Sequence, residues 1–411
     1  MSSAFSWLAE ASGGQRRSLV AASLGWMLDS MDVMLYALVL GEIQREMHLS
    51  AAAAGAMMSA TLIAAAIGGV GFGWFADRFG RVRALTFSVL LYSVATGLCG
   101  LTHSPAQLLA CRLLLGLGMG GEWASGAALV AETWPAAHRA KALALVQSSW
   151  AVGYGLGAAV VALLMPRFGW RAVFFAGIVP ALIAFWVRRG LREPDAWQQQ
   201  RRARVPVARL FRGALGRNMA VCATMNAAHL FAWWGLFTWV PHFLSLGTAE
   251  GGRGLSIVQT SGWTIVMQGG AFVGYIACGF LADRLGRKAT YIGYLLIAAL
   301  LVPLFAFVRN PSALLIVGPL VGFFATGCFS AFSVITSELF PTALRGSAMG
   351  FAYNIGRVTS AAAPWVVGAV SERSGFGVAL SITSAAFLLA ALIASALRLA
   401  AQEPVAETCS T

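Results

Sequence analysis

The feature that most constrains this chain is a succession of long apolar segments separated by short polar loops. A helix that crosses the hydrocarbon of a bilayer needs about 20 apolar residues. Only 11% of the 411 residues are charged, against about 25% in a soluble protein. The sequence therefore predicts an all-α membrane protein with twelve transmembrane helices, near residues 18–42, 50–75, 83–102, 105–130, 140–165, 170–188, 218–246, 257–281, 289–308, 312–337, 346–370 and 376–398.

The distribution of lysine and arginine predicts how these helices are oriented. Of the 29 basic residues, 21 fall in loops on one side of the predicted bilayer and six on the other. Basic residues concentrate in cytoplasmic loops. We therefore expect a bacterial inner-membrane protein whose two termini are both cytoplasmic. The formal net charge of +13 belongs to these loops, so we expect a lipid bilayer and no nucleic acid as partner.

The first six predicted helices are repeated by the last six. Gly73-Trp-Phe-Ala-Asp-Arg-Phe-Gly-Arg81 recurs as Gly279-Phe-Leu-Ala-Asp-Arg-Leu-Gly-Arg287, and Glu132-Thr-Trp-Pro135 recurs as Glu338-Leu-Phe-Pro341, both at an offset of 206 residues. Repeats with the same membrane orientation are typical of one large transporter class, which handles its substrate between them. We expect an N-terminal half (1–188), a cytoplasmic Arg-rich linker (189–217) and a C-terminal half (218–411).

The doubled G-x-x-x-D-R-x-G-R motif resembles the signature of the major facilitator superfamily. Within it, Asp-x-x-Asp in the first predicted helix, RLLLGLGMGGEW in the fourth and ELFPTALRGSAMGFAYNIGR entering the eleventh are similar to proton-coupled symporters of organic acids, such as aromatic acids and sialate. The resemblance implies the major facilitator fold, two pseudo-repeats of six helices. It also implies secondary transport of a small organic anion with a proton, by alternating access. We expect the protein to function as a monomer.

Five ionisable residues lie deep in predicted helices: Asp29, Asp32, Arg112, Glu122 and Arg357. Each costs about 2.5–3.5 kcal/mol at the bilayer centre on insertion scales, so each should face a cavity or a partner. In the first half three carboxyl groups accompany one arginine, and we expect Asp29, Asp32 and Glu122 to carry protons. Helix depths place Asp32 near Arg112 and Asp29 near Glu122. The alternative is that Arg112 only neutralises an aspartate.

Arginine, amide, imidazole and indole groups in the predicted helices suit an anion with an apolar body. Arg357 has no acidic neighbour in the helices of its own half, and a guanidinium can bind a carboxylate at two points. Asn226 and His229 repeat the i, i+3 spacing of the two aspartates. The alternative for His229 is a hydrogen bond to a neighbouring helix. The predicted substrate-binding residues are Arg112, Asn226, His229, Trp233 and Arg357.

In the resembled superfamily the acidic residue of the doubled motif pairs with nearby arginines and a helix end to latch the cytoplasmic side. Gly80 and Gly286 would permit tight turns. The alternative is a charged turn that only sets topology. The predicted gating residues are Gly73, Asp77, Arg78, Gly80, Arg81, Gly279, Asp283, Arg284, Gly286 and Arg287.

Other motifs point away from enzymes. The run Gly116-Leu-Gly-Met-Gly-Gly121 matches G-x-G-x-x-G, but it lies inside a predicted transmembrane helix. A dinucleotide site needs a preceding strand, so we expect these glycines to permit close helix packing. We recognise no G-x-x-x-x-G-K-[ST] run, hydrolytic triad or metal-ligand cluster, and expect neither cofactor nor metal.

Two other functions stay open. A proton-driven exporter of this superfamily usually has G-x-x-x-G-P-x-x-G-G in its fifth helix. Here that helix reads WAVGYGLGAAVVALLMP, without the central proline. A transporter-like sensor would signal through loop 189–217, whose charge fits a lipid surface equally well.

Overall fold

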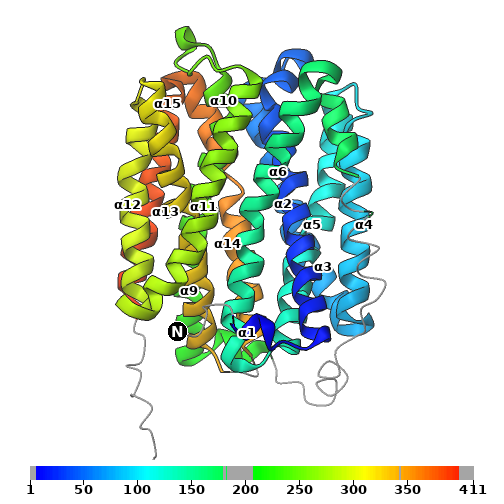
Figure 1. Ribbon diagram of the computed structural model, residues 1–411, viewed down its shortest axis with the longest axis vertical. Coiled ribbons are helices and arrows are strands. Elements are labelled where there is room, and N and C mark those ends of the chain that lie inside the picture. The colour runs from blue at the N-terminus through cyan, green and yellow to red at the C-terminus, as the bar shows by residue number, and fades with distance from the viewer. Residues whose placement is uncertain (1–5, 179–181, 183–206, 342–343, 398–411) are drawn as a thin grey trace, which may run out of the picture.

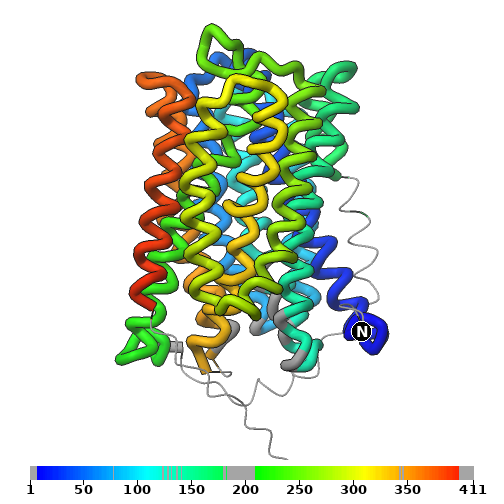
Figure 2. The backbone as a smooth tube through the Cα atoms, turned by 60° about the vertical axis from the view of Figure 1, so that its left-hand side comes forward, coloured from blue at the N-terminus to red at the C-terminus, as the bar shows by residue number. Residues whose placement is uncertain are grey.

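The computed structural model describes residues 6–178, 182, 207–341 and 344–397, and this part of the chain is helical with no strand. Long helices run side by side between two ends of a bundle (Figure 1). We call the end that carries α10 in Figure 1 the upper end, and the opposite end, where the N-terminus lies, the lower end. Figure 2 shows that the last described turn of α15 also lies at the lower end. The all-α prediction is confirmed.

The described part of the first half contains six helices: α1 (Ser6–Ala9), α2 (Gly13–Met47), α3 (Ala51–Phe79), α4 (Arg81–Cys99), α5 (Pro105–Thr133) and α6 (Ala136–Ala176). The rest of the described chain forms η1 (Val207–Phe211), α9 (Gly213–Phe237), α10 (Val240–Ser245), η2 (Thr248–Glu250), α11 (Ile257–Leu285), α12 (Arg287–Phe307), α13 (Pro311–Leu339), α14 (Arg345–Ser360) and α15 (Ala363–Ser395).

The helix boundaries differ from the predicted spans at several places, among them the span 218–246, which is divided between α9 and α10. In α6 and α15 the backbone leaves helical geometry at Gly169 (φ 72°) and Gly375 (φ 79°), so each element contains parts of two predicted spans. Glycine adopts such positive φ angles without steric cost. The eleventh span is divided between α14 and α15. Residues 179–181 and 183–188 of the sixth span and residues 189–206 of the predicted linker lie outside the described residues.

Apolar length makes this a multi-pass membrane protein. Eight helical stretches in the described ranges are long and apolar enough to cross a membrane, two of which, Lys141–Ala176 and Ser347–Ser395, run through the glycine breaks. Serine side chains mark where several of these helices begin. Ser50, Ser104 and Ser256 accept hydrogen bonds from the backbone three residues on, which satisfies N–H groups that the first helical turn leaves free.

The sequence repeat is also a repeat of packing. A Cβ atom on Gly68 would lie 2.0 Å from the Leu117 carbonyl oxygen, and one on Gly274 would lie 2.3 Å from that of Phe323. These pairs are offset by 206 residues, as are the contacts of α5 with α3 and of α13 with α11 that they belong to. Gly120 in the G-x-G-x-x-G run likewise approaches the Ala65 carbonyl, at 2.0 Å. The prediction that this run permits close helix packing is confirmed.

The two halves touch closely at the upper end. A Cβ atom on Gly55 of α3 would lie 2.3 Å from the Pro364 carbonyl oxygen of α15, and one on Gly368 would lie 2.4 Å from that of Ala51. The Glu372 carboxylate, from the second half, accepts a 2.8 Å hydrogen bond from the Ala52 N–H at the start of α3. A side chain of one half thus caps a helix of the other.

Candidate functional site

All five ionisable residues that the sequence places deep in the helices are buried, each at most 1% exposed. They separate into two groups. In the first, Asp29 interacts with Glu122 and Arg357. In the second, Asp32 bonds to Thr96, and Arg112 contacts Tyr36 and Met58.

The first group joins the two halves. The strongest electrostatic partners of Asp29 on α2 are Glu122 on α5, then Arg357 on α14. Asp29 Oδ2 has no hydrogen-bond partner in the described part of the chain. Arg357 donates to the Tyr353 hydroxyl at 3.3 Å and lies 4.8 Å from the centre of that ring. The second half therefore places a positive charge beside the Asp29 carboxyl group of the first, which also neighbours Glu122.

The second group corrects one expectation, because Asp32 and Arg112 do not pair. Asp32 Oδ2 accepts a 3.1 Å hydrogen bond from Thr96 Oγ1 on α4. The Arg112 guanidinium lies 4.5 Å from the ring of Tyr36 and donates to the Met58 sulfur at 3.2 Å. Tyr36 is one helical turn beyond Asp32 on α2. Arg112 therefore contacts α2 nearer the upper end, while Asp32 turns toward α4.

His229 is held within the second half. Its Nδ1 lies 3.3 Å from the Tyr291 hydroxyl of α12, its Nε2 lies 3.1 Å from Cys328 Sγ of α13, and its ring stacks on Phe329 at 4.0 Å. Each of these partners belongs to the same half. The contacts favour the alternative reading, in which His229 joins neighbouring helices.

Asn226 fastens α9 to α14 close to Arg357. Its Nδ2 donates to the Ala352 carbonyl oxygen at 3.3 Å, while its Oδ1 is buried without a partner in the described residues. A Cβ on Gly356 would lie 2.5 Å from that Nδ2. The missing side chain at Gly356 thus lets the amide reach the backbone of α14, one turn from the arginine.

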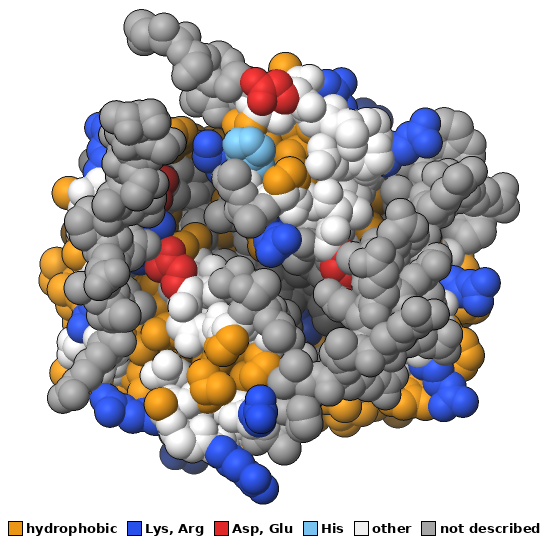
Figure 3. Space-filling view, turned by 90° about the horizontal axis from the view of Figure 1, so that it is seen from below, with side chains coloured by type: hydrophobic (Ala, Val, Ile, Leu, Met, Phe, Trp, Pro, Cys, Tyr) orange, Lys and Arg blue, Asp and Glu red, His pale blue; other side chains and the backbone are white. Residues whose placement is uncertain are grey.

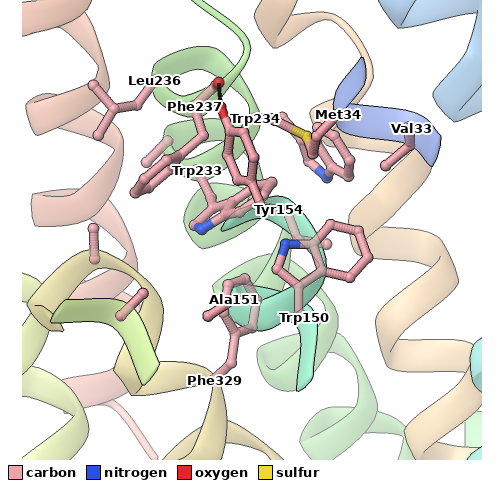
Figure 4. Close-up of a cluster of buried hydrophobic side chains, with 14 of the residues drawn as sticks. Val33, Met34, Trp150, Ala151, Tyr154, Trp233, Trp234, Leu236, Phe237 and Phe329 are labelled. Carbon is pink, nitrogen blue, oxygen red and sulfur yellow. Dashed lines mark hydrogen bonds between the residues drawn. The ribbon is translucent and has the colours of Figure 1, made fainter. Parts of the chain in front are cut away.

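Aromatic side chains from both halves meet at their interface (Figure 4). We call Trp26, Trp150, Tyr154, Trp233, Trp234 and Phe237 the aromatic cluster. Trp150 of α6 lies 4.7 Å from Trp26, 5.7 Å from Trp233 and 6.1 Å from Trp234, between ring centroids. The Tyr154 hydroxyl donates to the Phe237 carbonyl oxygen at 3.0 Å.

Sequence reasoning selected only Trp233 from the aromatic cluster. Trp233 Nε1 donates to Thr326 at 3.1 Å, whereas the Nε1 atoms of Trp150 and Trp234 are buried without a partner in the described residues. Trp26 precedes Asp29 by three residues, so the two share a face of α2. The run Gln147-Ser-Ser-Trp150, polar inside an apolar span, is the signal that was available for Trp150.

The doubled motif forms matching ion pairs at the lower end. An Arg81 Nη2 lies 3.4 Å from Glu132 Oε1, and Arg287 Nε lies 2.6 Å from Glu338 Oε1, again at an offset of 206 residues. Arg287 also reaches Asp283 at 3.7 Å. The Asp77 side chain lies outside the described part of the structure.

The remaining motif residues divide by role. Gly80 and Gly286 have φ angles of 114° and 90°, which confirms the predicted tight turns. A Cβ atom on Gly73 or Gly279 would meet nothing within 4 Å, and nothing in the structure explains these two glycines. Arg78 and Arg284 are exposed. They belong to the lower end, around which basic side chains are spread in Figure 3.

Similar proteins are known for nearly the whole chain. The probable 4-methylmuconolactone transporter of Cupriavidus pinatubonensis is 34% identical over 92% of this chain and 88% of its own length. The cis,cis-muconate transport protein of Acinetobacter baylyi is 33% identical, over 90% and 91%. A crystal structure of a D-xylose-proton symporter has the same fold, with a TM-score of 0.75 and 20% identity over 93% of this chain and 97% of that one.

The sequence profile of the Major Facilitator Superfamily matches residues 22–277 and 246–408. The two matches together cover both halves, and the fold and the doubled motif agree with them. The chain belongs to the major facilitator superfamily and is a membrane transporter, not an enzyme.

Proposed function

We propose that this protein is a secondary transporter that moves a small organic anion together with a proton across the bacterial inner membrane. The observation that carries the proposal is the buried Asp29, which lies between a second titratable acid of its own half, Glu122, and a cation of the other half, Arg357. Two relatives named for the transport of muconate and a muconolactone support an organic acid as substrate.

Competition for Arg357 couples the two solutes. While Asp29 or Glu122 is ionised, its negative charge offsets that of the arginine. Protonation of the acid that is still ionised removes this compensation, so that Arg357 becomes a binding site for the substrate carboxylate. A charged, unliganded site is costly to bury as the halves close. The halves therefore exchange sides when proton and anion are both bound, or both absent.

The second group of buried charges has a supporting role in this proposal. Arg112 contacts Tyr36 and Met58, so its positive charge attracts an anion approaching from the upper end. Asp32 is a second proton carrier. Asn226 Oδ1 and Trp233 belong to the binding surface, whereas His229 acts mainly by positioning α9 against α12 and α13.

The aromatic cluster favours a substrate with a flat, unsaturated body. Stacked and edge-on rings stabilise such a body by about 0.5–1.5 kcal/mol per pair beyond the burial of area. The cluster lies one turn of α2 from Asp29 and is formed by both halves. A carboxylate held by Arg357 would project its apolar part toward these rings.

The lower end faces the cytoplasm in this proposal, because the basic loops and the described chain ends gather there. The doubled motif then acts as the cytoplasmic latch. Glu132 and Glu338 hold Arg81 and Arg287 in place, and Asp77 and Asp283 close against neighbouring helix ends. The halves 1–188 and 218–411, joined by 189–217, move as the two rocking units of a monomer.

Uptake by proteoliposomes tests the proposal. Purified protein would be reconstituted and labelled cis,cis-muconate, benzoate and 4-hydroxybenzoate supplied outside, with and without an inward proton gradient. We expect accumulation that requires the gradient and is abolished by a protonophore. Gradient-driven movement in the direction opposite to the protons would instead identify the proton-driven exporter. Absence of any gradient-dependent flux of these acids would contradict the proposal.

A further inference from the structure

One buried amide in the second half has no hydrogen-bond partner at all in the described part of the chain. Gln268 of α11 is 2% exposed, and neither its Nε2 nor its Oε1 forms a hydrogen bond. Buried polar groups are nearly always paired, because leaving one unpaired loses its hydration without compensation. An amide with both atoms unpaired therefore calls for a partner that arrives from outside the chain.

Gln268 lies where the two halves meet. A Cβ atom on Gly155 of α6 would lie 3.8 Å from the Gln268 Cβ. Gly155 follows Tyr154 in sequence, so Gln268 packs against the segment of α6 that also carries Trp150 and Tyr154 of the aromatic cluster. The indole N–H groups of Trp150 and Trp234 also lack acceptors in the described residues. Three unpaired neutral polar groups thus belong to helices that meet at the interface.

Neighbouring polar side chains show what a purely structural role looks like here. Asn226 donates to the backbone of α14, and Trp233 donates to Thr326. Each ties α9 to another helix of the same half. Gln268 makes no such bond in the described part of the chain. Its amide therefore does not join helices.

The chemistry of this group complements that of Arg357. An amide offers a donor and an acceptor, and the two indoles offer donors, with no charge among them. Such a set suits a hydroxyl, a carbonyl or a neutral carboxyl group. It is less suited to the ionised carboxylate, which the guanidinium binds better. A substrate with polar groups at both ends would satisfy both sides of the interface.

We propose that Gln268, assisted by Trp150, binds a second polar group of the substrate and so selects organic acids that carry one. The inference rests on the proposed function, since it assumes that an organic acid occupies the interface. Sites that hydrogen-bond a substrate hydroxyl discriminate strongly against the analogue without it, because their own polar groups are then left unpaired.

Matched substrates separate this role from a structural one. 4-Hydroxybenzoate differs from benzoate by one hydroxyl, and 4-formylbenzoate carries a carbonyl group where 4-methylbenzoate carries a methyl group. Initial uptake rates in proteoliposomes would be measured for the wild-type protein, Gln268→Leu and Gln268→Met. For the acid with the second polar group we expect kcat/KM to fall about tenfold, mainly through KM. For its partner we expect a change of less than about twofold.

Gln259→Leu is the matched control, because it makes the same change in the capping box at the start of α11, away from the interface. It should alter both acids of a pair alike. Equal loss for both acids in the two Gln268 variants, or no loss for either, would overturn the inference. If the variants do not fold, binding of 4-hydroxybenzoate against benzoate to Trp150→Phe decides instead, and an unchanged preference there overturns it. Failure of the wild type to take up any of the four acids would refute the proposed function itself.

Discussion

The two halves share one framework but carry different chemistry. The close contact between Gly68 and Leu117 is repeated by Gly274 and Phe323, and the ion pair of Arg81 with Glu132 is repeated by Arg287 with Glu338. Elements that pack helices and form ion pairs at the lower end are therefore present twice. Such symmetry is what rocking of one half against the other requires.

The buried ionisable residues do not follow the repeat. At an offset of 206 residues, each position that is charged in one half is uncharged in the other: Asp29 corresponds to Gly235, Asp32 to Thr238, Arg112 to Gly318, Glu122 to Cys328, and Arg357 to Ala151. A buried charge is costly, so we expect each of these charged residues to have a function at its position. The difference assigns the acids to the first half and the cation that faces them to the second.

The largest effect should come from Arg357, a buried cation of the second half. Arg357→Ala leaves Asp29 and Glu122 without their positive neighbour and removes the proposed carboxylate site, so we expect net uptake to fall at least about 100-fold. Arg357→Lys keeps the charge but loses two-point binding, and should retain part of the activity. Uptake assays on both variants, with folding checked by size-exclusion chromatography, measure this. Near-normal uptake by Arg357→Ala would contradict the assignment of the substrate-binding cation to the second half.

Asp29→Asn should separate coupling from binding. The amide keeps size and polarity but cannot titrate, so we expect gradient-driven accumulation to be lost while exchange of labelled for unlabelled substrate persists at least in part. Loss of both activities would show that Asp29 is needed only to balance Arg357.

Asp32→Asn should have a smaller effect on accumulation than Asp29→Asn. Asp32 accepts a hydrogen bond from Thr96 and does not pair with Arg112. An amide in its place therefore does not remove a charge partner of Arg112. Replacing Arg112 by a neutral residue in the Asp32→Asn variant should accordingly not raise its thermal stability. A clear increase in the thermal unfolding temperature of the double variant would instead support the pairing of Asp32 with Arg112 that the sequence suggested.

The ion pairs at the lower end should behave alike in both halves. Arg81→Ala and Arg287→Ala each remove a pair to a glutamate, and we expect each to slow net transport by roughly three- to tenfold, while ligand binding by thermal shift is retained. The magnitude follows from about 1 kcal/mol for a partly exposed pair. A severe effect in one half alone would show that the framework is less symmetric than its contacts.

The smallest effect should come from the contact between halves at the upper end. Glu372→Gln weakens the cap that Glu372 provides to α3, and loss of a helix cap costs about 1 kcal/mol. We expect the populations of the closed and open upper end to change by about fivefold. Spin labels at Arg167 and Arg309, one in each half, would report the shift as a longer distance. An unchanged distance distribution would exclude a gating role for Glu372.

The sequence by itself determined the membrane class, the repeat, the turns at Gly80 and Gly286, and which ionisable residues would be buried. These features follow from rules that act locally, because the bilayer demands a fixed apolar length and penalises charge wherever it is enclosed. Single-residue glycine turns are equally local. The sequence did not predict that α6 and α15 would each run through a backbone break, at Gly169 and Gly375.

Only the tertiary structure decided which buried groups meet. Asp32 turns to Thr96, Arg112 to Tyr36, and Arg357 crosses to Asp29. Each outcome depends on how a helix is rotated about its axis, and hydropathy does not report rotation when nearly all faces are apolar. Trp150 and Trp233 are 83 residues apart in sequence and touch only because the two halves pack together. Packing of helices from separate halves, rather than any local pattern, assembled the candidate site.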